Sequence, residues 1–269
     1  MNTNSLFATI KPIIGVVHLL PLPGSPHFNG NLDAILDRSL EEVQIFKQGG
    51  VNGIIIENFH DVPFPNSEIT KAQLGLMASV ITLARREVNI PLGVNVHFND
   101  WEAEIALAYS CKAQFVRVEA FVDTVINPAG IVQPCCAEVT RYRKMVCENQ
   151  PVEIWADIHP KYSKVLVANS LQDSARMAQN ALADCIIVTG ETTGVETPLD
   201  DLKMVKEAVH LPIMAGSGTN VNNVKETLEI ADGVIVGSAF KVGGDVNNMV
   251  SLENVTQFMK AARDSQAKK

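Results

Sequence analysis

Along this chain, short apolar segments rich in β-branched residues alternate with longer segments whose apolar positions recur at helical spacing. The short segments predict strands at residues 13–18, 53–58, 92–97, 115–120, 152–158, 185–189, 212–215 and 234–236. The longer ones predict helices at residues 32–48, 71–87, 101–111, 137–148, 171–182, 198–209, 221–228 and 251–262. Eight strands, each followed by a helix, are typical of a closed α/β fold, the (β/α)8 or TIM barrel.

A doubly wound open sheet is the main alternative, and it would carry a G-x-G-x-x-G turn after its first strand. Here the first strand is followed by Leu-Leu-Pro-Leu-Pro-Gly at residues 19–24, which has too many prolines to begin a helix. No linker or low-complexity tract divides the chain before a polar stretch at residues 264–269. We therefore predict one barrel domain over residues 1–269 with a short polar C-terminal tail.

Composition and net charge restrict the classes of binding partner that this chain can have. With 46% hydrophobic residues, the chain can bury a large core, and its net charge of −8 argues against a nucleic-acid backbone as partner. No stretch reaches the ~18–20 apolar residues of a membrane span, and residues 1–8 lack the build of a signal peptide. The five cysteines include no C-x-x-C pair and are expected to be reduced thiols. We expect a soluble, cytoplasmic protein.

Two Gly-Ser turns near the C-terminus predict a phosphate-binding site. The seventh strand is followed by Gly216-Ser217-Gly218, and the eighth by Gly237-Ser238 with Lys241 three residues on. In barrels the seventh and eighth loops direct backbone amides at one phosphate, and glycine permits the close approach. Lys241 is expected to supply a mobile positive charge. The alternative is that these glycines only form tight turns. The predicted phosphate-binding residues are Gly190, Gly216, Ser217, Gly218, Gly237, Ser238 and Lys241.

Polar side chains gather at the C-terminal ends of the other strands, where barrel enzymes place their chemistry. Strand alternation places them inside the barrel, as it does Ile14, Val16 and His18 on one face of the first strand. This distribution predicts a binding or reactive pocket. The residues expected to contact substrate are Asn58, Asn95, His97, Arg117, Glu119, His159 and Thr189; those expected to act chemically are His18, Glu57, Asp157 and Lys161.

The individual roles stay open at this stage. Asp157 and Lys161 at the end of the fifth strand are suited to proton transfer, and a desolvated lysine can form a Schiff base. The alternative is that Asp157 forms an ion pair with Arg117 or Lys161 and organises the loops. His18 is either a catalytic residue or a histidine that lines the pocket and is held there by hydrogen bonds. Glu57 and Glu119 form an acid–base pair or neutralise Arg117.

Metal binding is not predicted. Histidines and carboxylates of suitable type are present, but no H-x-H follows the first strand and no acid ends the seventh. Both absences count against the divalent-metal sites of amidohydrolase-type and epimerase-type barrels. We therefore predict no metal and no cofactor.

Several of these segments resemble the BtpA/SgcQ family. The matching motifs follow barrel order: IGVVHLLPLPGSP from residue 14, ENFHDVPF from residue 57, GVNVHFND from residue 93, FVRV from residue 115, ADIHPK from residue 156, and Thr189-Gly190 with Thr193-Gly194, followed by the loops at Gly216 and Gly237. Two positions depart from the family pattern. Glu119 stands where an Asn-like residue is expected, and Tyr162 stands where a histidine often follows the lysine, which puts a shared mechanism in doubt unless His159 substitutes.

This resemblance implies a barrel of the ribulose-phosphate-binding class. One family branch is a factor for accumulation of photosystem I complexes at the thylakoid membrane. Another is associated with sugar-phosphotransfer gene clusters, and members occur in organisms without photosynthesis.

Two functions therefore follow. The first is an enzyme acting on a phosphorylated small metabolite, a sugar phosphate or a nucleotide-like compound, as a lyase, isomerase or transferase. The second is a non-catalytic biogenesis or assembly factor for a membrane complex such as photosystem I, which would involve peripheral membrane association. The oligomeric state is not determined by the sequence, and we expect a homo-oligomer. The apolar segments 21–26 and 62–65 are expected to form a pocket lid, an interface, or both.

Overall fold

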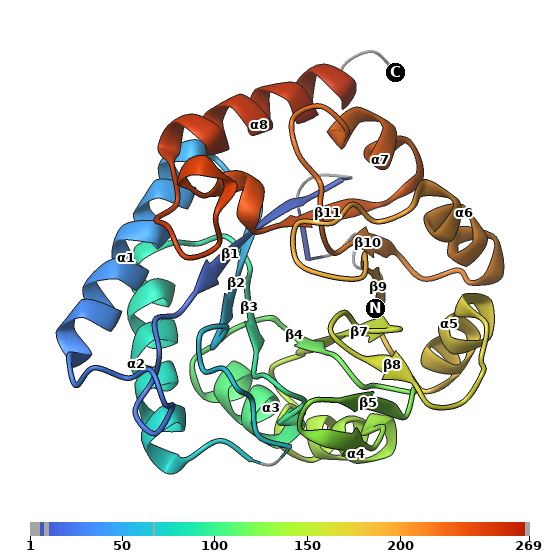
Figure 1. The fold of residues 1–269 in the computed structure, drawn as a ribbon, viewed down its shortest axis with the longest axis horizontal. Helices are drawn as coiled ribbons and strands as arrows, with labels where there is room; N and C mark the ends of the chain where they lie inside the picture. Colours follow the sequence, from blue (N-terminus) through green and yellow to red (C-terminus); the bar gives the residue numbers. More distant parts are fainter. Residues whose placement is uncertain (1–5, 8–10, 67, 267–269) are drawn as a thin grey trace.

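The computed structural model describes residues 6–7, 11–66 and 68–266, and the described chain forms a closed parallel barrel wrapped by helices (Figure 1). The predicted (β/α)8 fold is confirmed. Around the barrel, the strands neighbour one another in the order β1-β11-β10-β9-β7-β4-β3-β2. Their bounds are β1 (Ile13–His18), β2 (Gly53–Glu57), β3 (Leu92–Asn95), β4 (Phe115–Val118), β7 (Glu153–Ile158), β9 (Cys185–Val188), β10 (Ile213–Ala215) and β11 (Gly233–Val236).

A helix follows each barrel strand and packs its apolar face on the outside of the barrel. The helices are α1 (Leu32–Gly49), α2 (Lys71–Glu87), α3 (Trp101–Ser110), α4 (Cys136–Val146), α5 (Leu171–Asn180), α6 (Leu199–Ala208), α7 (Val224–Ile230) and α8 (Leu252–Gln266). Because α8 runs to Gln266, the first residues of the predicted polar tail are helical. Residues 267–269, and most of the N-terminal segment judged for a signal peptide, lie outside the described residues.

The barrel interior is filled by side chains from alternate strand positions, as the period of two requires. Ile14 and Val16 of β1 point inward, with Ile55 of β2 beside them. Deeper in the interior, the rings of Phe115 and Trp155 stack with centroids 4.0 Å apart. This layer fills the barrel interior beneath the C-terminal ends of the strands.

A small antiparallel sheet lies beside the barrel, in the order β6-β5-β8. Its strands are β5 (Val125–Asn127), β6 (Gly130–Val132) and β8 (Lys164–Val165), contributed by the loops after β4 and β7. The sequence prediction missed this sheet. Apolar residue pairs on both sides of the turn at residues 127–130 were the available hairpin signal, but such short strands are weak signals.

No helix among the described residues is long and apolar enough to cross a membrane.

Candidate functional site

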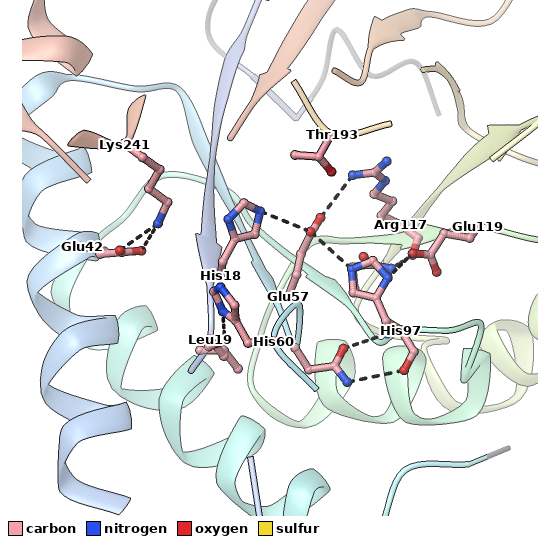
Figure 2. Close-up of polar contacts among 12 residues, drawn as sticks. His18, Leu19, Glu42, Glu57, His60, His97, Arg117, Glu119, Thr193 and Lys241 are labelled. Atoms are coloured by element: carbon pink, nitrogen blue, oxygen red, sulfur yellow. Dashed lines mark hydrogen bonds and ion pairs between the residues drawn. The ribbon is translucent and has the colours of Figure 1, made fainter. Parts of the chain in front are cut away.

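Arg117, near the C-terminal end of β4, contacts two acidic side chains in the barrel mouth, and Figure 2 shows its contact with Glu57, which lies between Arg117, His97 and His18. Its Nε and Nη2 donate to the carboxylate oxygens of Asp157 at 2.8 and 3.1 Å, and its Nη1 donates to Glu57 Oε1 at 3.2 Å. The planar guanidinium suits such paired contacts. Burial raises the pKa of Asp157, and Arg117 opposes that rise. Of the two roles considered for Asp157, the structure supports the ion pair with Arg117, which joins the ends of β4 and β7.

His97 lies between two carboxylates (Figure 2). Its Nδ1 contacts Glu119, and its Nε2 is 3.5 Å from Glu57 Oε2. Burial acts to lower the pKa of His97, but the charge of Glu119 and the contacts with both carboxylates raise it to about 9. His97 is therefore positively charged at neutral pH. Although burial acts to raise the pKa of Glu57, His97 and Arg117 hold it below its ordinary value.

His18, at the end of β1, has the opposite electrostatic character. Its Nε2 is 3.9 Å from Glu57 Oε2, and burial lowers its pKa well below the ordinary value despite that carboxylate. The imidazole is therefore neutral. Its Nδ1 is buried and has no hydrogen-bond partner among the described residues.

Lys161 is a buried lysine that forms no hydrogen bond or ion pair among the described residues, and its side chain is only 8% exposed. Burial lowers the pKa of its amine, as does the charge of Arg117, and the surrounding carboxylates only partly compensate. A lysine with a lowered pKa is a stronger candidate for a base or a nucleophile than a surface lysine, because more of it is neutral.

Lys161 borders two hollows in the mouth. The larger has a volume of about 730 Å³ and lies over the β2, β3 and β7 loops and the β5–β6 hairpin, with His97, Glu119 and Asp157 among its polar lining. The smaller is a cleft of about 20 Å³ that brings Lys161 and His18 to the Gly-Ser loops after β10 and β11. Space of that size holds about one water molecule. The cleft is therefore closed to a phosphate group in this conformation.

The loop after β9 covers this cleft by packing on the loop after β10. A Cβ on Gly218, whose φ is +67°, would lie 2.3 Å from the backbone nitrogen of Glu196. Thr197 Oγ1 lies 3.3 Å from Val188 O and 3.2 Å from Ser217 O, which links the two loops. Thr193 lines the cleft, and its buried Oγ1 has no hydrogen-bond partner among the described residues.

The prediction that Lys241 supplies a mobile positive charge to the phosphate site is wrong. Lys241 is fully buried away from the cleft, and its Nζ donates to both carboxylate oxygens of Glu42 on α1 at 2.8 and 2.9 Å (Figure 2). The short helical turns η2 (Ser238–Phe240) and η3 (Val242–Gly244) carry the chain outward after Ser238. Lys241 therefore joins these turns to α1 and supplies no mobile charge.

Three other predicted phosphate-binding residues use their polar groups within the protein. Ser217 Oγ accepts from the backbone of Gly190 at 2.7 Å and donates to Val195 O at 2.9 Å. The amide of Gly216 donates to Val188 O at 2.8 Å. These groups hold the loops together instead of facing an anion. All five residues of the two Gly-Ser turns line the cleft, and Gly218, Gly237 and Ser238 remain as candidates for binding the phosphate.

His159 does not reach the mouth as predicted. The strand β7 ends at Ile158, and the φ of +48° at His159 breaks the alternation that would have placed it beside Asp157. Its Nε2 lies 3.3 Å from Ser174 Oγ on α5 instead. It therefore cannot substitute for the histidine that Tyr162 replaces. The Tyr162 hydroxyl accepts from the backbone of Thr193 at 3.1 Å and so supports the loop over the cleft.

The two asparagines position other groups. Asn58 accepts from the backbone nitrogen of His97 at 2.7 Å and donates to Asp61 at 3.2 Å, so its amide fixes the β2 and β3 loops. Asn95 donates to Arg117 O at 2.9 Å and to Glu104 Oε1 at 3.2 Å. The structure does not support substrate contact for Asn58. Thr189 Oγ1 is buried and has no hydrogen bond among the described residues.

Among the described residues, no group of three or more histidine, cysteine, aspartate or glutamate side chains is arranged to hold a metal ion. The absence of a metal stays a prediction.

Sequence reasoning missed most of the apolar wall of the larger cavity. Phe59 and Phe98 line it, with Tyr162 and residues 128–129 of the β5–β6 hairpin. The segment 62–65, expected to be a lid or an interface, also lines it. The run of aromatic and proline residues after the second strand was the available signal.

Residues 9–264 of the chain match the sequence model of the BtpA family. The chain belongs to the BtpA family. This family member is 40% identical to an uncharacterized protein from Archaeoglobus fulgidus over 94% of this chain and 99% of that protein. It is 34% identical to the photosystem I biogenesis protein BtpA of Synechocystis sp. over 97% of this chain and 91% of that protein.

Solved structures similar to this BtpA-family chain share its fold. One is (S)-3-O-geranylgeranylglyceryl phosphate synthase from Thermoplasma acidophilum in complex with sn-glycerol-1-phosphate, with a TM-score of 0.62 at 10% identity, covering 94% of each chain. Another is thiamine phosphate pyrophosphorylase from Pyrococcus furiosus, with a TM-score of 0.60 at 17% identity, covering 95% of this chain and 96% of the other.

Proposed function

We propose that this protein is an enzyme acting on a phosphorylated small metabolite. The phosphate binds in the cleft formed by Gly218, Gly237 and Ser238, and Lys161 acts on the adjoining carbon as a base or a nucleophile. The observation that carries the proposal is the buried Lys161 side chain at the junction of this cleft with the larger cavity, whose amine makes no hydrogen bond or ion pair among the described residues. Carboxylates nearby compensate its burial only in part, and a buried amine without a direct ion pair is costly unless a ligand or a reaction uses it.

Unpartnered polar atoms in the cleft support the same proposal. His18 Nδ1 and Thr193 Oγ1 are buried and make no hydrogen bond within the described part of the chain. Since buried polar groups are nearly always paired, such atoms suggest groups that bind a ligand. In the proposed complex, the segment 191–196 moves outward to admit the phosphate, because the closed cleft of about 20 Å³ holds only about one water molecule.

A thermal-shift screen of phosphorylated metabolites, with inorganic phosphate included, tests the binding site. A ligand at 100 times its Kd adds about 2.7 kcal/mol of stability, which corresponds to a rise in Tm of roughly 5–10 °C. We expect Ser238→Asp to abolish this rise, because it places a negative charge in the cleft. Ser79→Asp, on the exposed face of α2, is the matched control. The proposal fails if no phosphorylated compound stabilises the wild type, or if both variants respond as the wild type does.

Turnover tests the catalytic part. Lys161→Met is expected to abolish conversion of any metabolite that the wild type converts, while the compound still raises the Tm of the variant. Retained conversion would remove Lys161 from the mechanism.

The alternative function, an assembly factor for a membrane complex, takes its support from the name of the Synechocystis relative. A relative from Caenorhabditis elegans is 31% identical over 96% of this chain, and an animal has no photosystem I. An activity on a metabolite is compatible with both relatives, and this favours the enzyme.

A further inference from the structure

The larger cavity is too big and too apolar for a small sugar phosphate alone. Its volume of about 730 Å³ lies within the range of sites that hold drug-sized ligands. Phenylalanine, tyrosine and proline residues make up half of its lining, from the loops after β2, β3 and β7 and from the β5–β6 hairpin. The polar residues of the lining are Asn66, His97, Glu119, Asn127, Asp157 and Lys161.

Sugar hydroxyls would find few partners on this wall. Each hydroxyl removed from water without a new hydrogen bond costs about 1–3 kcal/mol. Of the polar residues in the lining, His97, Glu119 and Asp157 form ion pairs with protein groups, and the side chains of Asn66 and Asn127 bond to the backbone of the β5–β6 hairpin. Lys161, Tyr162 and one oxygen of Glu119 have bonding capacity left, which is too little for the several hydroxyls of a polyol.

The shape of the wall suits a flat ring. Phe64 lies in the loop after β2, is partly exposed, and stacks on His97 with centroids 4.8 Å apart and ring planes 28° apart. Phe59 meets His97 edge-on, with centroids 6.1 Å apart. Tyr162 borders the same space and is 49% exposed. Aromatic rings gain energy from such stacked and edge-to-face neighbours beyond the area they bury.

The cavity and the phosphate cleft meet at Lys161, which lines both. A ligand that fills the two hollows therefore carries its phosphate on one side of the amine and its second group on the other. Glu119 also lines the larger cavity, and its Oε2 is buried without a hydrogen bond among the described residues. This oxygen can accept from an N–H on the edge of a heteroaromatic ring.

We propose that the ligand of this site is a phosphate ester that carries an aromatic or heteroaromatic group, with the ring seated against Phe64 and Tyr162. The inference rests on the proposed function for its phosphate half. It goes further by excluding a bare sugar phosphate and assigning the larger cavity to a ring.

Calorimetric titration with four probes tests this assignment: methyl phosphate, benzyl phosphate, 2-naphthylmethyl phosphate and ribose 5-phosphate. Burying a phenyl group is expected to make benzyl phosphate bind about 10- to 100-fold more tightly than methyl phosphate. The naphthyl ester should bind at least as tightly as the benzyl ester, and ribose 5-phosphate no more tightly than methyl phosphate. Ribose 5-phosphate binding as tightly as benzyl phosphate would overturn the inference.

Matched variants locate the ring. Phe64→Ala is expected to weaken benzyl phosphate binding by about tenfold and to leave methyl phosphate binding unchanged. Tyr162→Ala is expected to weaken benzyl phosphate more than methyl phosphate, because it removes both the ring and the hydroxyl that accepts from Thr193 in the loop over the cleft. Tyr109→Ala on α3 is the control, because Tyr109 is 41% exposed, similar to Tyr162, and lies outside the cavity lining. An equal loss of affinity for both esters in the Phe64 and Tyr162 variants, or no loss for either ester, would contradict the proposed seat of the ring.

The two proposals fail in different ways. If all the esters bind with the same affinity whether or not they carry a ring, the proposed phosphate site is supported and the proposed aromatic site is wrong. If no ester binds, the proposed function fails, and 2-naphthylmethanol decides the aromatic site by itself. Binding that Phe64→Ala weakens supports the site, and absence of binding overturns it.

Discussion

Gly218→Ala should destabilise the protein because the loop after β9 packs directly on this residue. The added Cβ would lie 2.3 Å from both N and Cα of Glu196, and 2.4 Å from the carbonyl carbon of Val195. These are backbone atoms, so no flexible side chain can give way. Overpacking of this kind costs about 1–3 kcal/mol. The left-handed φ of +67° adds about 1–2 kcal/mol for any residue with a Cβ.

Gly30→Ala separates the two contributions. Gly30 has a similar left-handed φ of +86°, but a Cβ there would meet nothing within 4 Å. It therefore carries the backbone cost of about 1–2 kcal/mol without the steric cost. The loss of unfolded-state entropy on replacing glycine is the same in both variants and cancels in the comparison.

Urea denaturation of the wild type and both variants measures the difference. We expect Gly218→Ala to lose about 1–3 kcal/mol more than Gly30→Ala. Hydrogen exchange should also show faster exchange at residues 191–196 in Gly218→Ala only. Equal losses with unchanged exchange would refute the packing of this loop over the cleft.

Three further predictions concern buried charges. The pKa of His97 in the folded protein, about 9, lies above its ordinary value, so its contribution to stability is complete below about pH 6.5 and is lost as the pH rises to 9. NMR titration should show one imidazole that stays protonated past pH 8 and is absent in His97→Gln. If every histidine titrates near its ordinary pKa, this prediction is wrong. Burial lowers the pKa of Lys161, so its ammonium form destabilises the folded protein below that pKa. Lys161→Met should therefore raise the Tm by more at pH 7 than at pH 10. A lower Tm of the variant at pH 7 would count against a Lys161 amine without an ion pair. Lys241→Met leaves the buried carboxylate of Glu42 with Arg38, 3.5 Å away, and the Val250 amide as its partners among the described residues, and should cost about 3 kcal/mol in urea denaturation. The double variant with Glu42→Leu should recover most of that loss, and no recovery would exclude the pair as the cause.

The barrel and the polar ends of its strands were predictable because strand alternation is a local property. Once the pattern places Ile55 inside, the period of two places Glu57 inside as well, and this holds at Arg117 and Asp157. The prediction failed where the strand ended. His159 lies one residue past β7, in a left-handed conformation that the pattern does not report.

Partner choice among charged residues could not be read from the chain. Lys241 follows a Gly-Ser turn, so its sequence context indicated the phosphate loop. The turns after β11 carry it instead to Glu42, 199 residues earlier. Arg117 could equally have paired with Glu119, but β7 presents both carboxylate oxygens of Asp157 to one edge of the guanidinium, and β2 presents Glu57 to its Nη1.

The sequence by itself determined the eight-unit barrel, the end of the barrel that carries polar side chains, and the family. These depend on periodicity and on motifs, which are local or nearly so. The tertiary structure decided which charged side chains form ion pairs. It left Lys161 without a hydrogen bond or ion pair among the described residues, and it placed aromatic side chains from separate loops around one cavity. Those features depend on contacts between segments far apart in the chain, and their distances are fixed only when the barrel closes.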